Sequence, residues 1–179
     1  MMHLAVELGF VAVAALAVLT AVDAVELWLG CLLGWTLLTL AWVDWEHMML
    51  PDVLTLPLVL AGLGATLLTD PQASWDHAGG AGVGYLAFRA IEIGYRSWRG
   101  RDGLGQGDAK LMAAAGAWLG LAPLPTVVVT AAVLGLAMAA ALRLSGRVGA
   151  SNGQMPFGPA LCIAIWAAWL GWDPPWPAL

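Results

Sequence analysis

The sequence carries little charge and few basic residues. Charged residues make up 11% of its 179 residues, against about 25% in soluble proteins. Seven Lys and Arg stand against twelve Asp and Glu, for a formal net charge of −5. This balance, with no basic patch, argues against nucleic acid as a partner. Hydrophobic residues reach 61%, more than a soluble domain of this size can bury, so lipid surrounds most of the chain.

Cysteine is also scarce. Cys31 and Cys162 lie inside apolar runs, and no CxxC pair occurs. This spacing excludes a zinc knuckle, a CxxC redox site and a disulfide framework. We predict that both cysteines are buried as small apolar residues. The first apolar run has no Lys or Arg before it and no clear cleavage site after it, which argues against a signal peptide.

Apolar runs of membrane-spanning length recur along the sequence. They predict an all-α, polytopic membrane bundle of about seven transmembrane helices (six to eight), forming a single domain over residues 1–179. The predicted spans are 4–22, 27–43, 53–69, 79–95, 109–123, 126–142 and 157–172.

The fourth predicted span is the least regular, because Arg89 and Glu92 interrupt it. These residues are three apart on one helical face, so they can form an ion pair. Gly80 and Gly84 in the same span have the GxxxG spacing that lets another helix approach closely.

The basic residues predict the orientation. In a seven-span arrangement all of them fall in or beside the loops that follow spans four and six: Arg89, Arg96, Arg99, Arg101, Lys110, Arg143 and Arg147. These two loops lie on one face, together with the loop at 44–52. The positive-inside rule makes that face cytoplasmic.

Two carboxylates on this face are the strongest candidates for chemistry. Asp44 ends the second predicted span and Asp108 begins the fifth. Acidic residues near membrane depth are costly, which makes a functional role the default hypothesis. Two close carboxyl groups resist joint ionisation, so one can hold a proton while the other acts as a base. Such a pair can activate water against a peptide carbonyl.

Structural roles compete with this hypothesis. An Asp at a helix start is commonly an N-cap, which suits Asp52 after Pro51 and would suit Asp108 taken alone. His47 is close enough in sequence to tune Asp44, but a solvated loop histidine is the commoner case. Lys110 can act on Asp108 or anchor the cytoplasmic flank of its helix.

Three segments together resemble the type IV prepilin peptidases, which are membrane aspartic proteases of the GxGD type. Asp44 with Leu50-Pro51-Asp52 resembles the family's first aspartate segment. Gly103-Leu104-Gly105-Gln106-Gly107-Asp108 resembles the second, and Met155-Pro156-Phe157-Gly158-Pro159 resembles the start of the last helix. The segments occur in the family's order and cover nearly the whole sequence.

The resemblance implies an endopeptidase that removes the basic leader of prepilins or pseudopilins at the cytoplasmic face of the bacterial inner membrane. It implies Asp44 and Asp108 as the catalytic pair, with no metal and no cofactor needed for cleavage. We expect Gly105 and Gly107 to let the backbone approach the substrate, and Asp52 to add negative charge for the leader, as do Glu46 and Asp102.

Phe157 and Gly158 are predicted to line the substrate groove, although the prolines beside them are also explained by the start of a helix. Membrane lipid is the other expected partner, and Arg96, Arg99 and Arg101 suit anionic headgroups. Many bacterial members also carry an N-terminal domain with two CxxC pairs and methylate the product with S-adenosylmethionine. This sequence has no such pairs, so methyl transfer is doubtful, and it resembles either a short peptidase-only member or a fragment of a longer one.

Two alternatives belong to other classes. A small proton-coupled transporter would use Asp44, Asp108 and Glu92 as a relay, which requires carboxylates spread across the membrane depth. A non-catalytic assembly factor would keep the fold but lose the activity, yet both aspartates and the glycines are present.

Overall fold

The computed structural model of the chain describes residues 2–100, 105–144 and 156–171, with the side chains of 2–6 left out. Throughout these residues the regular structure is helical, without β-strands. The elements are α1 (Met2–Thr20), α2 (Ala24–His47), α3 (Asp52–Thr69), the 3₁₀ turn η1 (Pro71–Ala73), α4 (Ser74–Arg99), α5 (Gln106–Leu119), α6 (Leu124–Leu144) and α7 (Gly158–Trp169). The predicted all-α bundle is therefore confirmed, with one α-helix at each predicted span.

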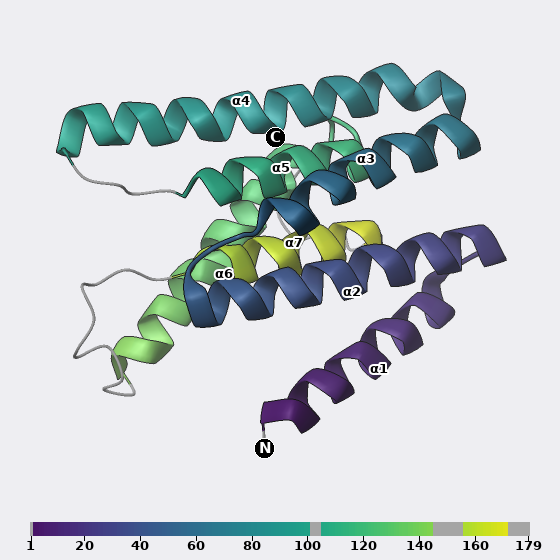
Figure 1. Cartoon of the computed structure of the whole chain (residues 1–179), viewed down its shortest axis with the longest axis horizontal. Helices are drawn as coiled ribbons and strands as arrows, with labels where there is room; N and C mark the ends of the chain where they lie inside the picture. Colours follow the sequence, from purple (N-terminus) through teal and green to yellow (C-terminus); the bar gives the residue numbers. More distant parts are fainter. Residues whose placement is uncertain (1, 101–104, 145–155, 172–179) are drawn as a thin grey trace.

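The helices pack side by side around α5 (Figure 1). This helix contacts α3, α4, α6 and α7, while α2 lies against α7, and α1 packs on α2. Nine of the fourteen residues of α5 are buried, on all of its sides. Its sequence is rich in Ala and Gly, which permits close neighbours on several faces. The central position of α5 fixes Asp108 inside the bundle.

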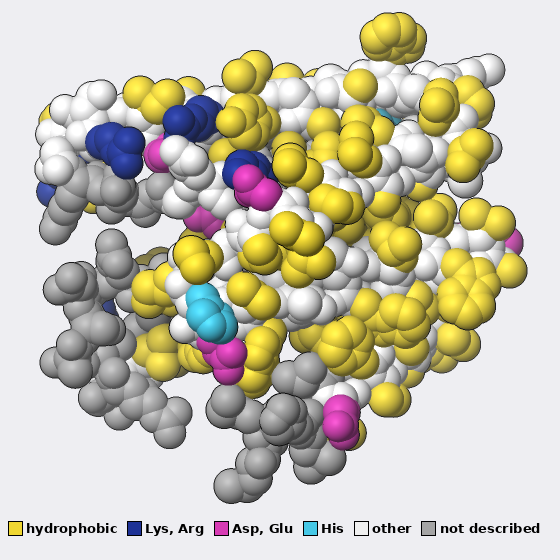
Figure 2. Space-filling model, viewed as in Figure 1, with side chains coloured by type: hydrophobic (Ala, Val, Ile, Leu, Met, Phe, Trp, Pro, Cys, Tyr) yellow, Lys and Arg dark blue, Asp and Glu magenta, His cyan; other side chains and the backbone are white. Residues whose placement is uncertain are grey.

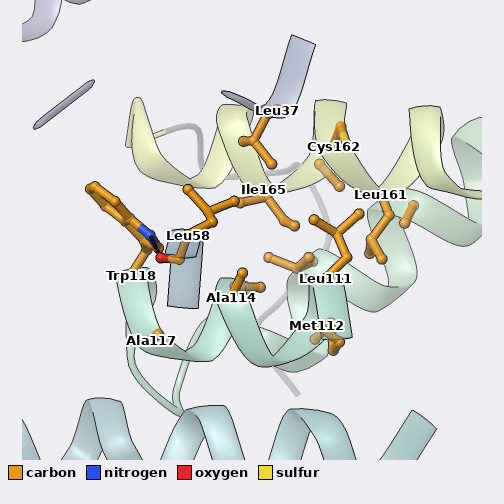
Figure 3. Packing of buried hydrophobic residues seen from close by; sticks show 14 of the residues in the cluster. Leu37, Leu58, Leu111, Met112, Ala114, Ala117, Trp118, Leu161, Cys162 and Ile165 are labelled. Carbon is orange, nitrogen blue, oxygen red and sulfur yellow. Dashed lines mark hydrogen bonds between the residues drawn. The ribbon is translucent and has the colours of Figure 1, made fainter. Parts of the chain in front are cut away.

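Apolar side chains from six helices, α2 to α7, form the core. Leu111 and Ala114 of α5 point toward Leu161 and Ile165 of α7 (Figure 3). Trp118 at the other end of α5 donates an Nε1–H hydrogen bond to the carbonyl oxygen of Leu58, at 2.8 Å. This bond ties α5 to α3 and satisfies the only polar group of a buried indole.

The contact between α4 and α5 depends on glycine, as the GxxxG spacing predicts. A Cβ at Gly84 would lie 2.7 Å from the carbonyl oxygen of Met112, and one at Gly80 would lie 2.8 Å from the backbone carbon of Gly120. Only residues without a side chain allow the two backbones to come this close.

Within the described residues, three helices are long and apolar enough to cross a membrane by length and composition, namely α2, α3 and α6. Shorter apolar helices cover Glu7–Thr20 and Gly158–Trp169. On the face shown in Figure 2, hydrophobic side chains spread over most of the surface, while Lys and Arg gather in the half of the view where α4 ends. A mostly apolar face with its basic side chains toward one end is typical of a membrane bundle.

All but one of the helix ends lie one to five residues from the predicted bounds, and two of these differences bear on the site or have a clear backbone cause. The second helix continues to His47, so Asp44 lies in its last turn rather than at its end, and Met48 stops the helix in a left-handed conformation (φ 51°). The fifth helix ends at Leu119 rather than 123, because Gly120 takes φ +79°, outside the helical region.

Candidate active site

Asp44 is a buried carboxylate in the last turn of α2. Its residue is 6% exposed, and its Oδ2 accepts a hydrogen bond from the backbone N–H of Gly158 at 3.0 Å. Gly158 is the first residue of α7, where unpaired amides and the helix dipole favour a negative charge. The start of α7 therefore fixes the position of the Asp44 side chain.

Gly158 fits this role because it has no side chain. A Cβ at this position would lie 2.5 Å from Oδ2 of Asp44 and 2.8 Å from its Cγ. Any other residue would have to displace the carboxylate or the helix. Its neighbour Phe157 is half-buried and packs on the core beside Gly135 of α6, so its ring supports the start of α7.

Asp108 is the second buried carboxylate, near the start of α5. It is 7% exposed, and its Oδ2 accepts a hydrogen bond from the backbone N–H of Gly105 at 3.2 Å. Gly105 is the N-cap position and Asp108 the third helical residue. The interpretation of Asp108 as an N-cap residue is therefore wrong, although its carboxylate still satisfies an amide at the helix start.

The glycines before Asp108 differ in their surroundings. A Cβ at Gly107 would lie 2.7 Å from Cβ of Leu50, so glycine is needed for the segment before α3 to lie against α5. A Cβ at Gly105 would make only an ordinary contact, 3.5 Å from Oδ2 of Asp108. Gly103 and Leu104, the first residues of this motif, lie outside the described residues, as do Arg101 and Asp102.

The fold brings the two carboxylates together from helices that are far apart in the sequence. Asp44 lies close enough to Asp108 for their charges to interact, and the thiol of Cys162 on α7 lies within electrostatic range of both. Cys162 is a buried free cysteine, as is Cys31, which confirms the prediction for both. The nearness of Cys162 to the aspartates was not predicted, because it follows from the packing of α7 between α2 and α5.

Asp52 has a partner that the sequence did not indicate. It is the first residue of α3, following Pro51 at the N-cap position, so the N-cap interpretation is wrong for it too. Its side chain is 56% exposed and pairs with the ammonium group of Lys110 on α5. This ion pair links the starts of α3 and α5, beside the segment that carries Asp108.

The predicted pair of Arg89 and Glu92 is confirmed. Nη1 of Arg89 lies 2.6 Å from Oε2 of Glu92. Glu92 is only 3% exposed, and its charge is also within range of Asp108. The spacing within α4 was the signal for the ion pair, whereas the nearness of Glu92 to Asp108 follows from the packing of α4 on α5.

Two other candidates are exposed rather than buried. His47 and Glu46 are exposed at the end of α2. Within residues 2–100, 105–144 and 156–171, no three His, Cys, Asp or Glu side chains are grouped to hold a metal ion. Met155 of the third motif lies outside these ranges. The site thus consists of two buried carboxylates, each bound by a glycine N–H, at one end of a membrane-type helix bundle.

Comparison with known proteins supports the same class. The Type IV leader peptidase family matches residues 31–140, more than half of the chain. The chain therefore belongs to the type IV leader peptidase family. No solved structure matches the chain.

Several curated relatives are similar over most of the chain. The "Prepilin leader peptidase/N-methyltransferase" of Aeromonas hydrophila is 41% identical over 142 residues, which are 79% of this chain and 49% of the relative. The protein of that name from Dichelobacter nodosus is 37% identical over 168 residues, 94% of this chain and 57% of the relative. The one from Pseudomonas aeruginosa is 38% identical over 142 residues, which are 79% of this chain and 49% of the relative. The chain spans about half the length of these relatives.

Proposed function

We propose that this chain is a membrane-embedded aspartic endopeptidase that removes the leader peptide of type IV prepilins or pseudopilins. The family supports leader peptide cleavage as the reaction. The observation that carries the catalytic assignment is the convergence of buried Asp44 and Asp108, from helices 64 positions apart in sequence, each with a glycine amide on its carboxylate.

The two aspartates act as acid and base on one water molecule. The ionised carboxylate takes a proton from the water while the water oxygen bonds to the scissile carbonyl carbon. The protonated carboxyl group gives its proton to the carbonyl oxygen, which leaves a neutral tetrahedral intermediate. The carboxyl group that took the water proton then gives it to the leaving nitrogen as the C–N bond breaks. The other carboxylate takes a proton from a hydroxyl group of the intermediate, so the pair again holds one proton. No metal or cofactor takes part in this scheme.

The charge distribution supports cleavage at the cytoplasmic face of the inner membrane. The described basic residues lie toward the ends of α4 and α6 and at the start of α5, which is the end of the bundle that holds both aspartates. The positive-inside rule assigns such an end to the cytoplasm. A basic leader suits the exposed carboxylates of Glu46 and Asp52 at this end.

The residues around the aspartates have supporting roles. Gly107 lets the segment before α3 lie against the start of α5, and Gly158 holds Asp44. Gly105 leaves open backbone for an extended substrate, and Asp52 contributes charge for the leader. Phe157, at the N-cap position of α7, contacts the bound substrate in this proposal. The unit that carries all of these is one peptidase domain.

The transporter alternative finds less support. It needs carboxylates at several depths, but among the described residues the buried acidic side chains are Asp44, Glu92 and Asp108, all toward the same end. No relay toward the opposite end follows from these three. An inactive assembly factor would have no need for two buried carboxylates, which are costly to keep in a bundle.

Co-expression with a prepilin tests the proposal. The wild-type chain should shorten the prepilin by its leader, seen as a mobility shift and a new N-terminus. Asp44→Ala and Asp108→Ala should each abolish the shift, while Glu7→Ala, which removes an exposed carboxylate on α1, should retain it. Unimpaired processing by either aspartate variant would exclude that residue from the chemistry.

A further inference from the structure

The face of α4 that contacts α5 ends in a charged residue. The buried residues of α4 are Gly80, Ala81, Gly84, Phe88 and Glu92. Four of them repeat every four residues, so they form one stripe along the helix. The first three residues of this stripe are Gly80, Gly84 and Phe88, and the fourth, Glu92, is the ionisable one.

The register of the two helices places Glu92 one turn beyond the level of Asp108. Gly80 lies against Gly116, and Gly84 lies against Met112, so a step of four along α4 matches a step of four back along α5. The same step brings Phe88 level with Asp108, and Glu92 one turn beyond it. Glu92 therefore lies where the chain enters α5.

Glu92 is held there by a second charged group. Arg89 Nη1 is 2.6 Å from Oε2 of Glu92, and the arginine side chain is 31% exposed while that of Glu92 is 4% exposed. The buried negative charge is thus compensated from the solvent side. The ion pair of Glu92 and Arg89 is separate from the hydrogen bond of Asp108, which comes from the backbone N–H of Gly105.

We propose that Glu92, balanced by Arg89, is a positioning residue that sets the protonation of Asp108 in the aspartate pair. A buried carboxylate within range of Asp108 disfavours a second negative charge there, and the guanidinium of Arg89 offsets this effect. The balance of the two charges decides how readily Asp108 gives up the shared proton. The inference rests on the proposed function, because it takes Asp108 as a catalytic residue. The experiment that tests it does not require cleavage.

Other ionisable groups near Asp108 lie on α2, α5 and α7. Asp44 on α2 is the partner in the pair, and Cys162 is the nearby titratable group on α7. Lys110, on α5 itself, is paired with Asp52 at the start of α3. Arg96 follows Glu92 one turn later on α4. Among the described residues, the buried charged side chains are Asp44, Asp108 and Glu92, so Glu92 is the buried charge outside the aspartate pair.

Infrared titration of the purified full chain in detergent tests the proposal without requiring cleavage. The carbonyl band of protonated Asp108 is identified as the band missing from Asp108→Asn, and its midpoint is followed against pH. Glu92→Gln leaves Arg89 uncompensated, so the midpoint should fall by about one pH unit. Arg89→Gln leaves Glu92 uncompensated, so the midpoint should rise by a similar amount. The double variant restores neutrality, so its midpoint should return close to that of the wild type.

Equal midpoints in the wild type, Glu92→Gln and the double variant would overturn the proposal and leave the ion pair a purely structural role. If Arg89→Gln fails to fold, the other two variants still test the proposal. Glu92→Gln leaves only the partly exposed Arg89 charge, and the double variant leaves neither charge. If the wild type cleaves no prepilin but the midpoints shift as stated, the proposed peptidase function fails and the control of Asp108 by Glu92 stands. If the wild type cleaves prepilin but the midpoints do not move, the peptidase function stands and the control by Glu92 fails.

Discussion

The backbone N–H of Gly158 donates a hydrogen bond to Oδ2 of Asp44, although 114 residues separate them. This bond joins the end of α2 to the start of α7. It satisfies a helix-end amide and a buried carboxylate at once. It also explains why glycine stands first in α7, since a Cβ there would lie 2.5 Å from the same oxygen.

Gly158→Ala should therefore lower leader cleavage by at least tenfold while the helices remain folded. The added methyl group forces Asp44 away from its place beside Asp108, and small displacements of catalytic groups are costly. Cleavage rate and circular dichroism on the same sample measure both effects. Gly64→Ala is the matched control, because a Cβ there meets nothing within 4 Å. Full activity in Gly158→Ala would show that the position of Asp44 does not depend on this contact.

Asp52→Asn should raise KM for a prepilin with a basic leader several-fold and leave kcat nearly unchanged. The exposed carboxylate contributes charge to binding, and such a contribution is screened by salt. The KM difference should shrink as ionic strength rises. Asp70→Asn, at the opposite end of α3, keeps an oxygen that can accept from the amide of Gln72 and should not change KM. A fall in kcat instead would place Asp52 in the chemistry.

Gly84→Ala should destabilise the bundle by about 1–3 kcal/mol, because the methyl group meets the carbonyl oxygen of Met112 at 2.7 Å and forces α4 and α5 apart. Gly82→Ala lies on the same helix with nothing within 4 Å of its Cβ. That control should be neutral or more stable by up to about 1 kcal/mol, through helix propensity alone. Thermal unfolding in detergent compares the two variants. Equal midpoints would mean that the α4–α5 contact is looser than described.

Cysteine labelling should place the two ends of the bundle on opposite sides of the membrane. His47 is the exposed last residue of α2, and Gln72 is exposed just after α3. The native Cys31 and Cys162 are buried and should react little. An impermeant maleimide should label Gln72→Cys in spheroplasts and His47→Cys only after lysis. The reverse pattern would put the aspartates outside the cytoplasm, where a leader still on the cytoplasmic side could not reach them.

The helices were largely predictable because apolar periodicity and length decide where they form. The exceptions have local causes. The fifth span was predicted too long because Gly120 at φ +79° ends the helix inside an apolar run. The Arg89–Glu92 pair and the GxxxG contact were predictable too, since both depend on spacing within one helix.

The site was predictable only in its parts. Asp44 and Asp108 stand out as carboxylates near membrane depth, but their partners come from other helices. The bond from Gly158, the pairing of Lys110 with Asp52 and the approach of Glu92 to Asp108 are set by helix packing. Sequence spacing carries no information on such contacts until the register of the helices is known.

The sharpest test of the aspartate pair is a structure of the chain with a bound peptide that carries a hydroxyl in place of the scissile carbonyl. We predict that one carboxylate oxygen of Asp44 and one of Asp108 lie within about 2.6–3.2 Å of that hydroxyl. A separation of the two carboxyl groups by more than about 10 Å with the peptide bound would contradict the shared-water mechanism, because no single water could then reach both.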